Sequence, residues 1–272
     1  MMAAELARLR NELRSRTPSN PTLSGFKVYS QNDEDGIIED CLSRIAQKYA
    51  TSKTFIEFGC GNGLENNTHY LLLKGYRGCW LDGNSKNIDF ISQSLSGLTF
   101  EHLLVREKFV NVQIINEILS EFSGFIGTTE PDFFSLDTDG NDVYFVDQAL
   151  KSVFPKLICV EYNAKFPPPL AVSIPYNETH RWSGDDYAGA SIQKWVDLLS
   201  DYKLVACSLS GVNAFFARID VADVFEAYDV KELYQPARYW IGGLQSGHPA
   251  SLKWLIAQLQ KSAPDNIELR AP

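Results

Sequence analysis

An acid and three alternating glycines follow an apolar segment in the sequence Thr-Phe-Ile-Glu-Phe-Gly-Cys-Gly-Asn-Gly, residues 54–63. Glycine allows a tight turn and lets a ligand approach the backbone closely. A strand that ends near Glu57, followed by this turn and a helix over residues 65–73, is typical of a nucleotide-binding turn. A purely structural corner is the alternative. The residues predicted to contact the ligand here are Glu57, Gly59, Gly61, Asn62 and Gly63.

The glycine spacing disfavours a nicotinamide dinucleotide. Such a fingerprint needs glycine at the sixth position of the turn, which is occupied here by Leu64. The next apolar segment, Gly-Cys-Trp-Leu-Asp-Gly over residues 78–83, ends in a second acid. An acid at this position can accept hydrogen bonds from both ribose hydroxyls of a nucleoside. We therefore predict an adenosine-type ligand beside Asp82 and Gly83.

Two more strand-like segments end in polar clusters. Asp137 and Asp139 follow the first, and Glu161 and Asn163 end the second. Helical and strand-like segments alternate at short intervals, which predicts an α/β fold with a mainly parallel sheet covered by helices on both faces. Ligands of such sheets bind at the carboxyl ends of the strands. The acids expected to gather at that edge are Glu57, Asp82, Asp137 and Glu161.

The composition indicates a folded, acidic protein. Its 272 residues, 44% hydrophobic and 12% aromatic, are enough for one α/β domain with additions. A net charge of −9 disfavours a broad nucleic-acid surface, because phosphates are held mainly by Lys and Arg. Without an apolar run of membrane-spanning length or a secretory signal, we expect a cytoplasmic protein without a membrane partner. The five scattered cysteines are expected to be buried thiols.

The two ends of the chain are expected to be helical additions. Residues 1–25 predict an amphipathic helix, from leucines at helical spacing, and a proline-containing linker over Thr17 to Gly25. The helix could join two copies of the chain in a homo-oligomer or pack on its own body. The central domain is predicted over residues 26–220. Residues 221–272 predict a helical extension in which the sequence indicates no chemistry.

Three further elements are predicted within the central domain. Residues 98–105 indicate a strand, and apolar spacing indicates a helix over residues 109–122. Residues 203–218 indicate two antiparallel strands joined at Ser210 and Gly211. A closing antiparallel hairpin of this kind distinguishes the predicted sheet from that of an ordinary dinucleotide-binding fold.

From about Tyr29 to Arg218 the sequence resembles the FkbM-type methyltransferases, a branch of the class I S-adenosylmethionine-dependent enzymes. The resemblance implies a Rossmann-like, seven-stranded, mostly parallel sheet with a C-terminal antiparallel hairpin. It also implies an S-adenosylmethionine cofactor, and O-methylation of a sugar, glycan or other small natural product. The matching residues are Ser30-Gln31, Glu34-Asp35, 55–63, Asn67-Thr68, 75–78, 135–142, Val160-Glu161 and 213–216.

This chain departs from the family at two places. Asp82-Gly83 replaces Glu-Pro after the second strand, and Asp137-Thr-Asp-Gly replaces Asp-Val-Glu-Gly after the fourth. Both changes keep an acid, so they bear more on the acceptor than on the cofactor. Ser30 and Gln31 are predicted to lie over the cofactor pocket, with simple helix capping by the neighbouring acids as the alternative.

Methyl transfer is an in-line displacement, so the enzyme must mainly align the acceptor with the sulfonium methyl group. A hydroxyl acceptor also benefits from a general base or a cation. Asp137, Asp139 and Glu161 are the candidate bases, with turn formation as the alternative role. The same three carboxylates could instead hold a divalent cation such as magnesium.

Residues 166–187 form a long connection, which in compact domains often contacts substrate. Ordinary loop packing is the alternative. A non-catalytic protein that keeps the fold for binding or scaffolding is the alternative to an enzyme, and a nicotinamide oxidoreductase is disfavoured by the glycine spacing. The residues predicted to contact a small-molecule or glycan acceptor are Asn163, His180, Trp182, Asp186 and Tyr187.

Overall fold

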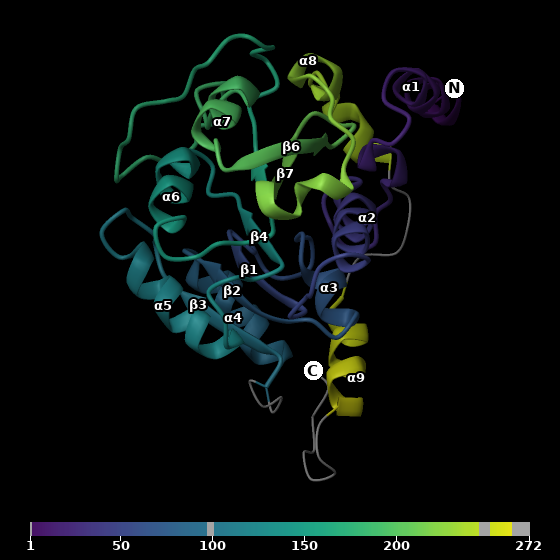
Figure 1. Cartoon of the computed structure of the whole chain (residues 1–272). Helices are drawn as coiled ribbons and strands as arrows, with labels where there is room; N and C mark the ends of the chain where they lie inside the picture. The colour runs from purple at the N-terminus through teal and green to yellow at the C-terminus, as the bar shows by residue number, and fades with distance from the viewer. Residues whose placement is uncertain (1, 97–100, 245–250, 263–272) are drawn as a thin grey trace.

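The computed structural model describes residues 2–96, 101–244 and 251–262 (Figure 1). Its centre is a seven-stranded sheet with the order β3-β2-β1-β4-β5-β7-β6. Strands β1 to β5 are parallel, whereas β7 runs antiparallel between β5 and β6. The strands are β1 (Thr54–Phe58), β2 (Arg77–Asp82), β3 (Leu103–Glu107), β4 (Phe133–Leu136), β5 (Leu157–Glu161), β6 (Tyr202–Cys207) and β7 (Asn213–Arg218).

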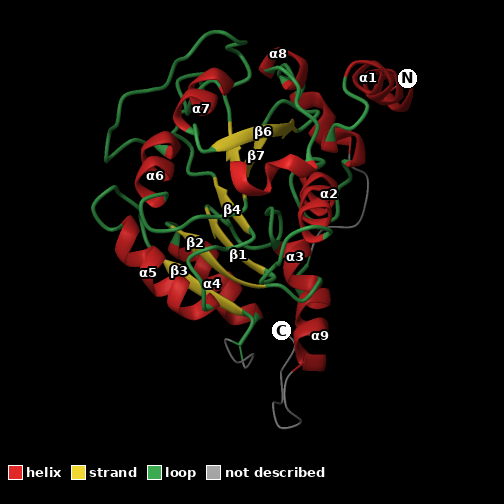
Figure 2. Cartoon of the chain, in the orientation of Figure 1, coloured by secondary structure: helices red, strands yellow, loops and turns green. Residues whose placement is uncertain are grey.

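This topology confirms the predicted α/β, Rossmann-like class I methyltransferase fold with its C-terminal antiparallel hairpin. Helices cover both faces of the sheet (Figure 2). The helices are α1 (Met2–Arg16), α2 (Glu34–Ala46), α3 (His69–Leu73), α4 (Ser85–Ser94), α5 (Ile115–Ile126), α6 (Asp142–Ala149), α7 (Ile192–Leu198), α8 (Val230–Leu233) and α9 (Lys253–Ser262). Single-turn helices are η1 (Pro21–Ser24), η2 (Ile219–Val224) and η3 (Tyr239–Leu244).

The central strands have an apolar core on each side. Side chains alternate between the two faces of a strand. Ile56 and Phe58 of β1 therefore pack with Phe122 of α5 on one face. Phe55 packs with Ile37 of α2 and Ile91 of α4 on the other. All five residues of β1 are buried, as expected of a parallel strand covered on both faces.

The N-terminal segment is an integral part of the fold. Leu9 and Leu13 of α1 are buried, and Leu9 belongs to a small apolar cluster with Leu209 and Ile241. The helix therefore packs on its own chain, which was one of the two outcomes left open. The predicted linker after it is wrong. Thr17, Asn20 and Thr22 are buried in this segment, and the Thr22 hydroxyl donates to the carbonyl of Cys207 at 2.8 Å.

Two helices begin later than predicted, because polar side chains hold the preceding residues in turns. Helix α3 begins at His69 rather than at residue 65, after a turn tied to Glu57. Helix α5 begins at Ile115 rather than at residue 109. There the side-chain oxygen of Asn111 accepts from the backbone N–H groups of Gln113 and Ile114, at 3.0 and 3.1 Å, as in an Asx turn.

Some predictions reach residues outside the described structure. The third strand starts at Leu103, and residues 98–100 of its predicted range are not described. In the C-terminal extension, η2, α8, η3 and α9 are described, whereas residues 245–250 and 263–272 are not. All five cysteines are buried, as predicted.

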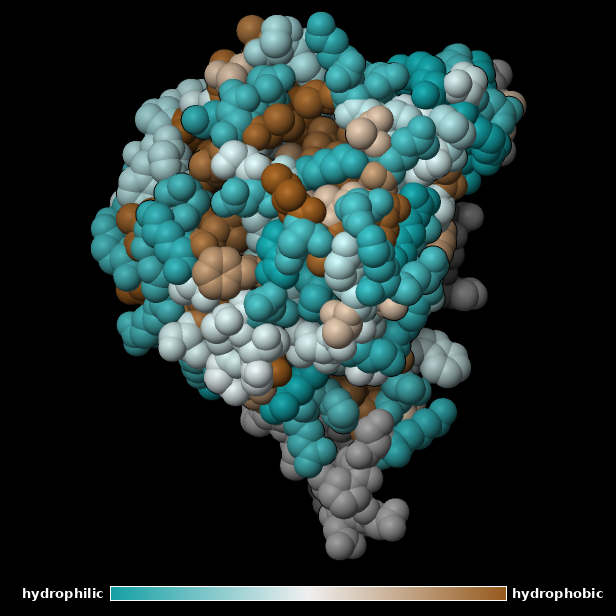
Figure 3. All heavy atoms as spheres, viewed as in Figure 1, coloured by the Kyte–Doolittle hydropathy of each residue, from teal (hydrophilic) through white to brown (hydrophobic). Residues whose placement is uncertain are grey.

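The face of the molecule seen in Figure 3 is mainly hydrophilic, with apolar residues gathered in a few places between polar ones. Among the helices that the structure describes, none is long and apolar enough to cross a bilayer.

We expect the replacement Leu13→Ala to lower the free energy of unfolding by about 2–5 kcal/mol, because it removes a side chain that is only 1% exposed. Urea unfolding followed by circular dichroism measures this loss. Asn11→Ala, on the exposed face of the same helix, should change stability by less than about 0.5 kcal/mol. Equal stability of the two variants would contradict the packing of α1 against the domain.

Candidate functional site

Two cavities open at the carboxyl ends of the parallel strands. The first, of about 690 Å³, is lined by Gly59, Gly61, Leu81, Asp82, Gly83, Asn84, Ser85, Asn87, Lys108, Phe109, Val110, Asp137, Thr138, Asp139, Asn141, Phe145, His180 and Arg181. The second, of about 1130 Å³, is lined by Gln31, Asn32, Glu65, Asp137, Asp139, Glu161, Tyr162, Asn163, Lys165, Trp182, Gly184, Asp185, Asp186, Ala188, Gly189, Val212, Ala237 and Tyr239. Asp137 and Asp139 line both cavities, so the two spaces meet at these acids.

The glycine turn after β1 lies against the loop after β4. Gly59 has a φ of +82°, and a Cβ atom on it would lie only 1.7 Å from the carbonyl oxygen of Asp137. Glycine is therefore required at this position both for its conformation and for space. Gly61 also has a positive φ, of +56°, but an added Cβ would meet nothing within 4 Å. Its backbone is open toward the first cavity, which it lines.

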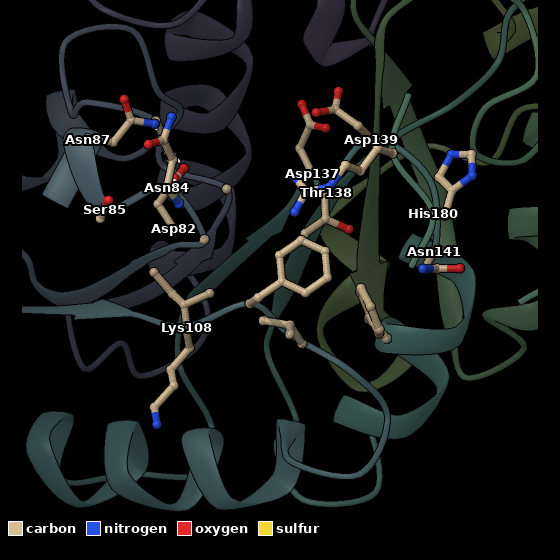
Figure 4. A pocket seen from close by; sticks show the side chains of 18 residues that line it. Asp82, Asn84, Ser85, Asn87, Lys108, Asp137, Thr138, Asp139, Asn141 and His180 are labelled. Carbon is tan, nitrogen blue, oxygen red and sulfur yellow. Dashed lines mark hydrogen bonds between the residues drawn. The ribbon is translucent and has the colours of Figure 1, made fainter. Parts of the chain in front are cut away.

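Asp82 connects this turn to the loop after β2. One carboxylate oxygen accepts from the N–H of Gly61 at 2.9 Å, and the other accepts from the N–H of Asn84 at 2.8 Å and from Asn87 Nδ2 at 3.1 Å. Asp82, Asn84, Ser85 and Asn87 lie together on one side of the cavity in Figure 4, opposite Asp137 and Asp139. The acid is thus fixed in orientation at the cavity wall.

Glu57 lies outside the residues that line the cavities, although it was predicted to contact the ligand. Its carboxylate accepts hydrogen bonds from Asn66 Nδ2 at 2.7 Å, from the N–H of Asn67 at 2.8 Å and from the hydroxyl of Thr68. Burial raises the pKa of Glu57 to about 7. In this structure Glu57 shapes the turn that leads from the glycines to α3.

Four other predicted cofactor contacts also lie away from the first cavity. Ser30 is fully buried, and its backbone N–H and its hydroxyl both donate to Asp35. Asn62 closes a local turn by accepting from the N–H of Leu64 at 3.1 Å. A Cβ on Gly63 would lie 2.8 Å from the ring of Trp80, so this glycine provides space for core packing. Gln31 lines the second cavity rather than the first.

Asp137, Asp139 and Glu161 form a cluster in which one carboxylate oxygen of each lies within 4.8 Å of the others. Asp139 has a φ of +61°, a strained conformation for a non-glycine residue and one that is frequent at functional sites. Burial, followed by the negative charges of Asp142 and Asp139, raises the pKa of Asp137 to about 7. Burial and the charge of Asp137 raise the pKa of Glu161 as well.

Asp142 holds the loop that carries these acids. Its carboxylate accepts from the backbone N–H of Thr138 at 2.8 Å and of Gly140 at 3.1 Å. It is itself buried, at the first turn of α6. Of the three acids in this loop, Asp142 therefore shapes the turn, whereas Asp137 and Asp139 line the cavities.

The long connection crosses both cavities. It is fastened to the domain through Asn141, which exchanges hydrogen bonds with the backbone of Asn177 at 2.8 and 3.2 Å. His180, predicted to contact substrate, lines the first cavity, where the guanidinium of Arg181 lies 5.2 Å from the ring centre of Phe109. Further along, Trp182, Asp185 and Asp186 line the second cavity.

The predicted substrate residues fall into three groups. Asn163, Trp182 and Asp186 line the second cavity, whereas His180 lines the first. Tyr187 is 57% exposed and is not among the lining residues of either.

Several lining residues escaped the sequence analysis. Asn84 and Asn87 follow Asp82 directly, and their proximity to an acid at a strand end is a signal that could have identified them. Phe109 follows the next strand in the same way. Tyr239 lies in the C-terminal extension, where no chemistry was predicted, yet it lines the second cavity. Nothing in the local sequence indicates that the extension returns to this edge.

The carboxylate cluster supplies three oxygen ligands, whereas magnesium requires about six in an octahedron. Water or substrate would have to supply the remaining ligands. The divalent-cation hypothesis therefore stays a prediction.

Comparisons with known proteins found similar solved structures. No family model and no curated protein matches the chain. An O-methyltransferase from Bacillus cereus in complex with SAH has 16% identity and a TM-score of 0.39, covering 61% of this chain and 74% of that one. The N-terminal domain of EvdMO1 with SAH bound has 11% identity and a TM-score of 0.44, covering 78% and 96%. The CurJ carbon methyltransferase has 11% identity and a TM-score of 0.44, covering 70% and 54%. Similarity at this level assigns no activity to this chain.

We expect Glu57→Ala to lower the free energy of unfolding by at least about 2 kcal/mol, because it leaves donors on Asn66, Asn67 and Thr68 without their buried acceptor. Chemical denaturation is the measurement. Glu65→Ala removes an exposed acid from the same turn and a surface ion pair with Lys27, so it should cost less than about 1 kcal/mol. A loss for Glu57→Ala no larger than for the control would contradict the structural role of Glu57.

Proposed function

We propose that this protein is an S-adenosylmethionine-dependent O-methyltransferase of the FkbM type, acting on a small hydroxylated acceptor such as a sugar or glycan. The observation that carries the proposal is the meeting of the two cavities at Asp137 and Asp139. A cofactor in the first cavity and an acceptor in the second would face each other at these acids. The resemblance of the sequence to FkbM-type enzymes supports the acceptor class.

The first cavity fits an adenosine cofactor with a positive charge. Its volume of about 690 Å³ is within the range of small-molecule sites. Asp82 lies where ribose hydroxyls can donate to it, and the half-exposed ring of Phe109 offers a face on which a purine can stack. Asp137 and Asp139 would attract a sulfonium and repel the phosphates of a dinucleotide. These contacts favour S-adenosylmethionine over a nicotinamide cofactor.

When bound, S-adenosylmethionine supplies an electrophilic methyl group on a positively charged sulfur. Asp137 is suited to accept the proton of an attacking hydroxyl, because a pKa of about 7 lets it act as a base near neutral pH. Glu161 and Asp139 lie close enough to orient the same hydroxyl. The long connection, with His180 at the first cavity and Trp182 at the second, would exclude water from the junction.

A bulky side chain at Gly61 tests the cofactor cavity. We expect Gly61→Leu to weaken S-adenosylhomocysteine binding by at least about tenfold, measured by calorimetry, because the side chain would enter the space beside Asp82. Gly75→Leu is the matched control, since Gly75 also has a positive φ, of +80°, and no atom within 4 Å of an added Cβ, but does not line the cavity. Unchanged affinity in Gly61→Leu would exclude this placement of the cofactor.

The kcat/KM for S-adenosylmethionine should rise with pH and level off above about pH 7, because this ratio reports the pKa of the free enzyme and Asp137 acts as a base only when deprotonated. Asp137→Asn should lower the rate by about 10²-fold or more and remove this inflection. Asp147→Asn, an exposed acid on α6, should keep both the rate and the inflection. An inflection that persists in Asp137→Asn would rule out Asp137 as the titrating base.

Chelation separates the base from the metal hypothesis. If Asp137 acts as a base without a metal, EDTA should leave the rate and its pH profile unchanged. A loss of activity in EDTA that magnesium restores would instead assign the carboxylate cluster to a divalent cation.

A further inference from the structure

The second cavity has an excess of negative charge. Only one lysine, Lys165, is among its described lining residues, and it is paired with Asp186. The acids that line the cavity are Glu65, Asp137, Asp139, Glu161, Asp185 and Asp186. Glu65 is paired with Lys27 and Asp186 with Lys165, so Asp137, Asp139, Glu161 and Asp185 line the cavity without an ion-pair partner among the described residues and make its potential negative.

The hydrogen-bond donors of this cavity are largely used within the chain. The indole N–H of Trp182 donates to the carbonyl of Asp185 at 2.7 Å. Asn163 Nδ2 donates to the carbonyls of Asp186 and Ala188 at 2.9 and 3.2 Å. The Lys165 ammonium is turned to Asp186. Among the described lining side chains, the Gln31 amide and the Tyr239 hydroxyl remain as donors, so the cavity mainly offers acceptors.

Asn32 provides independent evidence for a ligand that donates hydrogen bonds. It lines the second cavity and is only 5% exposed. Its backbone N–H and its side-chain Nδ2 both donate hydrogen bonds to the carboxylate of Glu34, at 2.7 and 3.3 Å. An ionised carboxylate can only accept hydrogen bonds, so the amide atom that faces Glu34 must be the nitrogen of Asn32. This fixes the orientation of the amide group. The remaining polar atom, Oδ1, makes no hydrogen bond to the residues that the structure describes, so it is open to a donor from a ligand in the cavity that Asn32 lines.

We propose that the acceptor carries a protonated amino group beside its hydroxyls, as an amino sugar does. An ammonium group has three donors and no acceptor, so it complements Asn32 Oδ1 and the carboxylates of Asp139 and Glu161. The ring of Trp182, which is 53% exposed, adds an aromatic surface on which a cation or a sugar ring can lie. The inference rests on the proposed function, because it names the acceptor of the same site.

The amino group of the acceptor binds to the carboxylates of the cavity, and a hydroxyl group of the acceptor receives the methyl group. The acceptor oxygen forms a bond to the methyl carbon while the carbon–sulfur bond breaks, and that electron pair stays on sulfur as a neutral thioether. The hydroxyl proton passes to Asp137. The ammonium keeps its protons and therefore has no lone pair with which to attack, so methyl transfer is directed to oxygen.

The test measures binding of D-glucosamine, N-acetyl-D-glucosamine and D-glucuronic acid to the full chain by calorimetry. The protein is saturated with S-adenosylhomocysteine, EDTA is present throughout, and the pH lies between the pKa of Asp137 and that of the amine, so that the carboxylate is ionised and the amine is protonated. We expect the amine to bind at least about tenfold more tightly than the neutral sugar, and the acid to bind weakest. Added salt should reduce the difference.

Variants locate the preference in this cavity. Glu161→Gln and Asp139→Asn should each reduce the preference for the amine by about tenfold, and the second serves if the first does not fold. Glu121→Gln, on the exposed side of α5, should keep the preference.

Two results overturn the inference: binding of the neutral or anionic sugar as tight as that of the amine, or binding of none of the three. An amine preference that survives both Glu161→Gln and Asp139→Asn overturns it too. S-adenosylhomocysteine binding is measured first in the same samples. No binding of that nucleoside overturns the proposed function, whereas its binding without an amine preference overturns the acceptor class alone.

Discussion

The contact between the backbone of Gly59 and the carbonyl of Asp137 determines the geometry of the whole edge. A side chain on Gly59 would overlap that carbonyl, so the loops after β1 and β4 can approach only through a glycine. This approach places the open glycine turn beside the acids at the end of the neighbouring strand. Gly59 and Asp137 both line the first cavity, and Asp137 also lines the second.

The loops at this edge are held by carboxylates rather than by regular structure. Glu57 holds the turn before α3, Asp82 the turn after β2 and Asp142 the loop after β4. Asp35 does the same for the segment before α2, since one of its oxygens accepts from the N–H groups of Val28, Tyr29 and Ser30 at 2.6–2.8 Å. Each carboxylate accepts hydrogen bonds from backbone donors of the loop that it holds. Among these carboxylates, Asp142 holds the loop that carries Asp137 and Asp139.

The sheet could be predicted from the sequence because its signals are local. Apolar segments ending in Asp82 and Glu161 alternate with helical ones, and the Lys203 to Arg218 segment has a turn at its centre. Those signals predict a mainly parallel sheet and the hairpin, whereas the number of strands was implied by the family resemblance. The alternation also placed the strand-end acids at one edge, where Asp82, Asp137, Asp139 and Glu161 indeed line cavities.

The roles of single polar residues could not be predicted in the same way, because they depend on contacts between distant segments. Glu57 has the same type and position as a ligand-binding acid, and only its bonds to Asn66 and Asn67 show that it shapes a turn. Asn32 borders the second cavity, and its amide is held there by Glu34. Tyr239 reaches the same cavity from the C-terminal extension. No periodicity in the sequence encodes these approaches.

The raised pKa values of Asp137 and Glu161 have the same origin as the proposed preference for cations. Burial and mutual repulsion disfavour the charged forms of both side chains, so the free protein retains protons there to a higher pH than an exposed acid would. A cation bound between them offsets the repulsion and lowers both pKa values. Linkage makes the effect reciprocal: a rise in pH through this range strengthens binding of a cation that keeps its own charge. A sulfonium keeps its charge at every pH, whereas an amine loses its charge once the pH exceeds its own pKa. The cofactor should therefore bind more tightly as the cluster ionises, and a cationic acceptor should bind best in the interval between the pKa of the cluster and that of its amine.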